Sequence, residues 1–131
     1  MKGKIALEEH FAIQETLGDS ERFFVPDVWR TKRSQLLDIT GERLRRMDET
    51  GIEYSIISLN APAIQAIADP KRAVEVAEIA NDTLAELIAK HPDRFGAFAA
   101  LPLQDPEAAT KEFNRCVTEL GFAGALVNGF S

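Results

Sequence analysis

Short apolar runs alternate along the chain with segments whose apolar residues recur at helical spacing. Each run is apolar at consecutive positions, which is typical of strands in a covered parallel sheet. The four runs are Lys4–Glu8, Tyr54–Leu59, Phe95–Leu101 and Phe122–Val127. This order predicts an α/β protein whose parallel strands are joined by right-handed crossover helices.

Three helices are predicted between these strands, and residues at their ends support the assignment. Asp69 and Asp105 each offer a side-chain acceptor at an N-cap and precede a proline, which needs no N–H partner at the first helical position. Gly51 and Gly121 follow the first and third helices, where glycine adopts the left-handed conformation at little cost. Helical spacing predicts that the core-facing residues are Ala73, Ala77, Ala80, Leu84 and Leu87 in the second helix, and Ala109, Phe113, Cys116, Val117 and Leu120 in the third.

The segment from Phe11 to Thr40 is predicted to be a long loop. Loops of this length are uncommon in compact α/β domains and are usually functional when they occur. The segment carries the aromatic residues Phe23, Phe24 and Trp29 amid charged neighbours. Two interpretations remain open: a lid or pocket wall that keeps water from a flat substrate, and a local hydrophobic patch or subunit contact.

Two architectures fit this order of elements, a small doubly wound domain and the first half of a (β/α)8 TIM barrel. A complete barrel needs about 250 residues, and this chain has 131. The last predicted strand is followed by no helix, and Glu8-Glu9-His10-Phe11 stands where a nucleotide-binding fold carries its glycine-rich loop. Both observations favour the barrel, so residues 1–131 are interpreted as the N-terminal half of a single barrel domain.

Composition narrows the range of partners. The formal net charge is -6 and the basic residues are scattered, which argues against a nucleic-acid partner. The apolar runs are too short to cross a bilayer and the N-terminus lacks a secretory signal, so we expect a cytoplasmic protein with no membrane partner. The single cysteine, Cys116, excludes an internal disulfide and a cysteine-cluster zinc site. Any metal must therefore be held by histidine and carboxylate side chains.

The strongest chemical signal is Glu8-Glu9-His10 at the carboxyl end of the first predicted strand. Side chains two apart on a strand share a face, so Glu8 and His10 are expected to point together while Glu9 points away. Ligands bind at the carboxyl ends of parallel strands, and a carboxylate with an imidazole suits a divalent ion such as zinc or manganese. Two ligands do not complete a coordination shell, and a surface acid beside a loop histidine remains an alternative interpretation.

Asparagines follow two of the predicted strands and so lie at the same rim. Asn60 comes after the second strand and Asn128 after the fourth. An amide at this place either donates to a substrate oxygen or caps a turn, and turns favour asparagine in general. His91 lies at a helix end and Cys116 on an apolar helix face, so both are interpreted as structural residues.

Several blocks of the sequence resemble one enzyme family. Gly3–Ala12, Ser58–Pro62, Pro92–Pro102 and Gly121–Ser131 are similar in order and spacing to the γ-resorcylate (2,6-dihydroxybenzoate) decarboxylases. These belong to the amidohydrolase superfamily and are related to aminocarboxymuconate-semialdehyde decarboxylase. The resemblance covers the chain nearly end to end. It implies a (β/α)8 barrel that binds one divalent zinc or manganese ion and assembles as a homo-oligomer, a dimer or a tetramer.

The resemblance also implies roles for individual residues. Glu8 and His10 match the family's first two metal ligands, Phe23 or its neighbour Phe24 matches a substrate-contacting aromatic, and Asn128 matches a polar residue beside the substrate. The remaining ligands in the family are a histidine and an aspartate from later strands, and the aspartate also takes part in proton transfer. No catalytic acid is therefore expected within the chain.

The reaction that the resemblance implies is the reversible, non-oxidative decarboxylation of a hydroxybenzoate, with a small aromatic acid as substrate. Because the proton donor is expected beyond Ser131, the chain alone is expected to be inactive. Two alternatives remain open. One is a metal-dependent amidohydrolase or lactonase on the same barrel, and the other is a non-catalytic half-barrel that acts as an assembly module.

Overall fold

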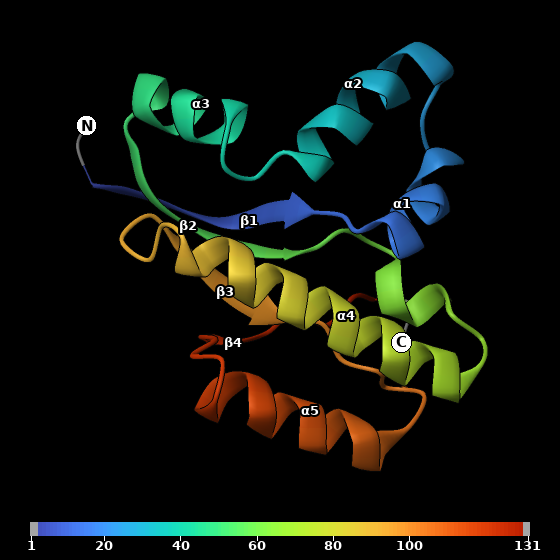
Figure 1. Ribbon diagram of the computed structural model, residues 1–131. Coiled ribbons are helices and arrows are strands. Elements are labelled where there is room, and N and C mark those ends of the chain that lie inside the picture. Colours follow the sequence, from blue (N-terminus) through green and yellow to red (C-terminus); the bar gives the residue numbers. More distant parts are fainter. Residues whose placement is uncertain (1–2, 130–131) are drawn as a thin grey trace.

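The computed structural model describes residues 3–129 as four parallel strands with helices between them. The strands are β1 (Lys4–Phe11), β2 (Ile52–Leu59), β3 (Phe95–Ala99) and β4 (Gly124–Ala125). The helices are α1 (Gln14–Glu21), α2 (Pro26–Leu37), α3 (Glu42–Thr50), the 3₁₀ helix η1 (Ala63–Ala66), α4 (Pro70–Ala89) and α5 (Pro106–Thr118). The strands pair in the order β1-β2-β3-β4, and Figure 1 shows α3, α4 and α5 following one another along the sheet. The predicted parallel sheet with crossover helices is confirmed.

The two faces of the sheet differ in burial. Ile57, Phe95 and Ala97 belong to the core beneath the helices and are at most 2% exposed. Ile5 pairs in register with Tyr54 on the other face and is 63% exposed. Because side chains alternate along a strand, one face of the sheet is helix-covered core and the other is open. This one-sided covering is typical of a barrel wall, whose helices lie outside its strands.

Several helix ends follow the local sequence signals. Asp69 and Asp105 accept hydrogen bonds from backbone N–H groups in the first turns of α4 and α5, and each is followed by a proline in the sequence. Gly51 follows α3 with a φ of 73°, and Gly121 after α5 has a φ of 72°. These predicted helix ends are confirmed. Of the helices within residues 3–129, none combines the length and the apolar character needed to cross a membrane.

All four strands differ in extent from the prediction, β2 beginning earlier at Ile52 and β3 ending earlier at Ala99. β1 continues to Phe11, because its ladder to β2 includes the pairs His10–Ser58 and Phe11–Leu59. Glu8 therefore lies inside the strand rather than at its last residue. β4 is reduced to two residues, Gly124 and Ala125, whose described pairing is with β3 alone.

The segment from residue 11 to residue 40 is not a long loop, and that prediction was wrong. It contains α1 and α2, which share a small cluster made of Ala12, Leu17 and Trp29 with Leu36 packed against it. Neither helix has a side-chain N-cap, and the only residue that α2 buries is Trp29. The helices thus lack the apolar periodicity that marks a helix in sequence, and tertiary packing stabilises them instead.

Helix α5 packs through a different face from the one predicted. Ala109 and Cys116 are buried as predicted, and burial raises the pKa of the Cys116 thiol to about 12, which fits a structural residue. Phe113 and Val117, however, are 38% and 39% exposed, while Glu112 is 4% exposed. The prediction for those two apolar residues was wrong because a carboxylate with suitable partners occupies the buried face.

The partners of Glu112 form a polar network between α4 and α5. Asn81 donates from Nδ2 to Glu112 Oε1 at 2.8 Å, and Arg115 donates to both carboxylate oxygens and to Asp82. Asn81 also pairs with both the N–H and the carbonyl of Ala100 after β3. Burial alone would raise the pKa of Glu112, but the hydrogen bonds from Arg115 and Asn81 outweigh it and lower the pKa.

Candidate functional site

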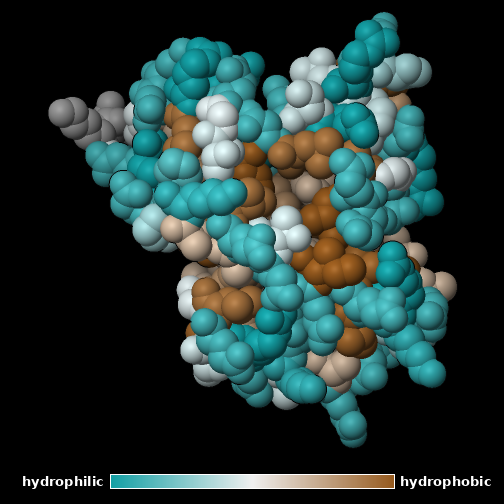
Figure 2. All heavy atoms as spheres, viewed as in Figure 1, coloured by the Kyte–Doolittle hydropathy of each residue, from teal (hydrophilic) through white to brown (hydrophobic). Residues whose placement is uncertain are grey.

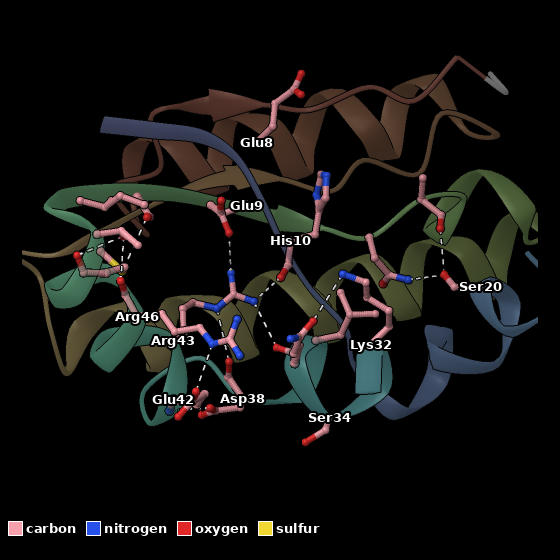
Figure 3. Close-up of a pocket in the computed structure, with 18 of the residues that line it drawn as sticks. Glu8, Glu9, His10, Ser20, Lys32, Ser34, Asp38, Glu42, Arg43 and Arg46 are labelled. Atoms are coloured by element: carbon pink, nitrogen blue, oxygen red, sulfur yellow. Dashed lines mark hydrogen bonds and ion pairs between the residues drawn. The ribbon is translucent and has the colours of Figure 1, made fainter. Parts of the chain in front are cut away.

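The site begins at the irregular end of the edge strand β1. The register to β2 shifts between Ala6 and Glu9, which is a β-bulge, and bulges re-aim the side chains around them. Figure 3 shows the side chains of Glu8 and His10 projecting to the same side of β1, while the carboxylate of Glu9 reaches toward Arg43. The strand therefore presents one carboxylate and one imidazole to a common space.

Some polar atoms of Glu8 and His10 already have hydrogen-bond partners in the protein, and others do not. His10 Nδ1 lies 3.0 Å from the hydroxyl oxygen of Ser58 on β2, its register partner. Within residues 3–129 the second ring nitrogen of His10, Nε2, has no hydrogen-bond partner, and neither does the carboxylate of Glu8, an exposed residue. One imidazole nitrogen and one carboxylate thus remain available to a ligand.

Glu8 and His10 carry the kinds of ligand atom that a divalent metal binds. A carboxylate oxygen and an imidazole nitrogen are among the ligands that zinc and manganese take. In the part of the chain that the structure describes, no group of three or more histidine, cysteine, aspartate or glutamate side chains gathers at one point. Glu8 and His10 can therefore supply two positions of a coordination shell, and further ligands have to complete it.

Arg43 of α3 holds this end of β1 from the helix side. Its guanidinium donates to the backbone carbonyl of His10 at 2.5 Å and to the carboxylate of Glu9 at 3.4 Å. It also donates to the carbonyls of Gln35 and Asp38, both at 3.3 Å. The Arg43 side chain is only 13% exposed, so burial lowers its pKa, while the charges of Glu9 and Asp38 act in the opposite direction. One side chain thus joins β1, α2 and α3.

A cavity of about 640 Å³ is lined by residues of β1, α2 and α3. Figure 2 shows a recess between α2 and α3 with hydrophobic side chains at its floor. The acidic residues on this helix side are already engaged, because Glu9 and Glu42 pair with arginines and Asp38 accepts hydrogen bonds from the first turn of α3. Glu8 and His10 line the edge of the cavity but project away from the Arg43 side. The side chains that could hold a metal therefore lie on the other side of the strand from Arg43.

The two aromatic candidates lie in different environments. Phe24 lines the cavity and stacks on Trp29, with the ring centroids 5.7 Å apart. Phe23 is 57% exposed and lies outside the cavity lining, with the guanidinium of Arg22 5.0 Å from its ring centroid. Of the pair, Phe24 is the residue that the structure brings to the same cavity as Glu8 and His10.

The turn after β2 joins α1 to the rim. Asn60 Nδ2 donates to the hydroxyl of Ser20, and this hydroxyl donates to the carbonyl of Ala61 at 2.9 Å. Asn60 is 5% exposed, and its Oδ1 has no partner within residues 3–129. The structure shows a structural role for Asn60 that is neither of the two predicted, because its amide donates to a hydroxyl on α1. Ser20 lies in a segment predicted to be a loop, so no local signal pointed to this contact.

Asn128 lies in a chain of contacts along the same rim. Its Nδ2 donates to Gln65 Oε1 at 3.1 Å, and Gln65 Nε2 donates to the carbonyl of Leu101 at 3.1 Å. The segments after β2, β3 and β4 are thereby connected. Sequence reasoning missed Gln65, because a glutamine in a short 3₁₀ helix carries no distinctive pattern.

Comparison with known proteins places the chain in a family. The family model described as amidohydrolase matches residues 25–130. The chain belongs to the amidohydrolase family. A γ-resorcylate decarboxylase of Rhizobium radiobacter is 64% identical over 131 residues, which are 100% of this chain and 40% of the relative.

Solved structures agree with this assignment. A dihydroxybenzoic acid decarboxylase from Polaromonas sp., crystallised with manganese and the inhibitor 2-nitroresorcinol, matches with a TM-score of 0.96 and 64% identity over 98% of this chain and 39% of that one. A 2,6-dihydroxybenzoate decarboxylase in complex with 2,6-dihydroxybenzoate matches with a TM-score of 0.97 and 64% identity over 98% and 40% of the two chains. The chain thus spans about two fifths of the length of these relatives. The predicted fold class, the first half of a (β/α)8 barrel, is confirmed.

Proposed function

We propose that this chain belongs to a metal-dependent carboxy-lyase that decarboxylates a hydroxybenzoate, 2,6-dihydroxybenzoate or a similar acid. The observation that carries the proposal is the pair of available donors, Glu8 and His10, on one side of β1. The relatives that are 64% identical bear the name γ-resorcylate decarboxylase. The cofactor we propose is one divalent ion, zinc or manganese, and the similar Polaromonas enzyme contains manganese.

In this proposal Glu8 and His10 are two of the metal ligands. A bound divalent ion supplies Lewis acidity and a template for the carboxylate and the phenol oxygen of the substrate. Ser58 orients the imidazole of His10, and Arg43 fixes the backbone that carries it. These side chains orient the ligands and do not themselves transfer a proton.

Decarboxylation replaces the carboxylate of the ring with a proton. The bond between the ring carbon and the carboxylate breaks, CO2 leaves, and an acid delivers the proton to that carbon. Within residues 3–129 no third acidic or histidine side chain joins Glu8 and His10. We therefore assign the proton donor and the remaining ligands to parts of the protein outside these 131 residues. According to this proposal, residues 1–131 form one half of a single metal-dependent domain. We expect residues 1–131 alone to be inactive.

We extend the proposal to two substrate contacts and to assembly. Phe23, or Phe24 beside it, would face the aromatic ring of the substrate. Asn128 would donate to a substrate oxygen from the rim that it shares with Gln65. The oligomeric state proposed is a dimer or a tetramer, which light scattering on the full-length protein would measure.

The activity test uses the full-length protein that contains this sequence. Incubation with 2,6-dihydroxybenzoate should release CO2 and resorcinol in equal amounts. A chelator should abolish the release, and manganese or zinc should restore it. Hydrolysis of a lactone without CO2 release from 2,6-dihydroxybenzoate would contradict the proposal and favour the amidohydrolase alternative.

A matched pair of variants tests the ligand assignment. Glu8→Gln removes the charge of the available carboxylate and should weaken metal binding by more than about 100-fold, beyond the loss typical for residues that only support a ligand. Glu9→Gln makes the same chemical change one residue away, on the side of β1 that faces Arg43, and should leave metal affinity nearly unchanged. Calorimetric titration with Mn²⁺ measures both. Equal losses in the two variants would refute the assignment of Glu8.

A further inference from the structure

We propose that Ser58 is a positioning residue that selects which ring nitrogen of His10 faces the metal. The inference rests on the proposed role of His10 as a ligand and adds a residue that acts through it. Ser58 lies on the neighbouring strand β2 and pairs in register with His10. Its hydroxyl oxygen is 3.0 Å from His10 Nδ1, and the residue is 1% exposed.

The two supports of His10 act on different parts of the residue. Arg43 binds the backbone carbonyl from the helix side of β1, which fixes the strand but leaves the imidazole free to rotate. Ser58 contacts the ring itself, and this ring projects to the side of the strand away from Arg43. Within residues 3–129 the hydroxyl of Ser58 has no other hydrogen-bond partner, and a buried hydroxyl that loses its partner destabilises the fold. The ring is therefore held with Nδ1 toward Ser58.

This contact bears on metal binding because a neutral imidazole carries its proton on one nitrogen only. When Nδ1–H donates to Ser58 Oγ, Nε2 keeps its lone pair and can coordinate a metal. In the other tautomer the Ser58 hydroxyl donates to Nδ1 and the proton is on Nε2, which then cannot act as a ligand. Metal-bound histidines almost always donate their other N–H to a neighbouring acceptor, and Ser58 Oγ is the acceptor placed to receive it.

The first test reads the tautomer directly and needs no activity. The ¹⁵N chemical shifts of the imidazole nitrogens are measured in the metal-free full-length protein at alkaline pH, where imidazoles are neutral. His91, the other histidine of residues 1–131, packs edge-on against Phe95 and serves as an internal reference. We expect the proton of His10 on Nδ1. A proton on Nε2 of His10 in the unmodified protein would overturn the proposal.

The second test compares two serines of the same strand. Ser58→Ala removes the acceptor, while Ser55→Ala makes the same change at an equally buried serine that faces Met47 of α3. Ser58→Ala should weaken Mn²⁺ binding about 10- to 100-fold and move the His10 proton to Nε2. Ser55→Ala should change neither readout, and Ser58→Thr, which keeps the hydroxyl, should restore both.

The outcomes separate this inference from the proposed function. Equal affinity losses in Ser58→Ala and Ser55→Ala would show a general packing effect and overturn the role of Ser58. If the tautomer and the affinity respond as expected but 2,6-dihydroxybenzoate releases no CO2, the positioning role stands and the proposed reaction fails. If thermal unfolding shows that Ser58→Ala does not fold, the tautomer in the unmodified protein and in Ser58→Thr decides.

Discussion

Two polar clusters in this protein use the same kinds of side chain in opposite ways. Between α4 and α5, the carboxylate of Glu112 is buried and accepts hydrogen bonds from Asn81 and Arg115. At the end of β1, the carboxylate of Glu8 is exposed and has no partner within residues 3–129, and His10 uses one of its two ring nitrogens. Polar groups whose hydrogen-bonding capacity is fully used stabilise a fold. Polar groups that keep unused donors or acceptors on an ordered strand are available for binding.

The two clusters also place their arginines differently. Arg115 binds the carboxylate of its cluster directly, and its positive charge helps to lower the pKa of Glu112. Arg43 lies on the opposite side of β1 from Glu8 and His10 and binds the backbone of His10 and the carboxylate of Glu9. An arginine beside Glu8 would occupy the carboxylate. An arginine behind the strand orders it and leaves the ligand atoms available.

The largest effect that tests this comparison is expected for Asn81→Ala. The substitution leaves the N–H of Ala100 and one hydrogen bond of Glu112 without a partner in a buried place, which should lower the free energy of unfolding by about 2–4 kcal/mol. Metal affinity of the protein that remains folded should not change. Urea denaturation measures the loss, and Asn114→Ala at an exposed position of the same helix pair is the control. A normal stability for Asn81→Ala would break the contrast between the clusters.

A smaller effect is expected for Arg43→Lys. An ammonium group cannot reach the four acceptors that the planar guanidinium joins, so the free energy of unfolding should fall by about 1–2 kcal/mol. Arg46→Lys changes an exposed arginine whose described ion pair is with Glu42, and it should stay within about 0.5 kcal/mol. The same urea titration serves both variants. Equal stability would show that Arg43 does not order the end of β1.

Acid should weaken the cluster between α4 and α5. Because the pKa of Glu112 is lowered in the folded protein, its contribution is fully present above the ordinary value of 4.5 and is lost as the pH falls through the lowered pKa. We expect an acid-dependent loss on the order of 1 kcal/mol that Glu112→Gln does not show. Thermal unfolding between pH 7 and pH 3 provides the readout. If the unmodified protein and Glu112→Gln lose the same stability as the pH falls, the acid-dependent loss does not come from Glu112.

The smallest effect is expected for Phe113→Ser. Phe113 is 38% exposed, so the substitution should change the free energy of unfolding by less than about 1 kcal/mol. If Phe113 were the core residue that helical spacing predicts, the loss would be about 3–5 kcal/mol. Denaturation of this one variant therefore distinguishes the observed face of α5 from the predicted one.

Local chemistry made part of this structure predictable. The caps Asp69 and Asp105 and the glycine after α3 act within one helical turn, and their roles could be read directly from the sequence. The shared side of Glu8 and His10 follows from the two-residue period of a strand. Strand order left a doubly wound alternative open. Two observations on the sequence favoured the barrel, and the resemblance to one family agreed with them.

Other features depended on residues far apart in the chain. Helices α1 and α2 have weak local signals and exist through contacts around Trp29 and between Ser20 and Asn60. Glu112 replaces Phe113 in the core because Asn81, 31 residues earlier, is placed to donate to it. Periodicity counts apolar residues along one element and contains no information about such partners.

The amino-acid sequence alone was enough to establish the parallel α/β topology, which follows from the order of the elements. It also established the helix ends at Asp69, Asp105 and Gly51 and the shared side of Glu8 and His10, because these depend on short-range geometry. Only the tertiary structure decided that Ser58 holds the imidazole, that Arg43 holds its backbone and that Phe24 rather than Phe23 lines the cavity. These contacts join separate elements, and their geometry exists only when strands pair in one register and helices pack on one face.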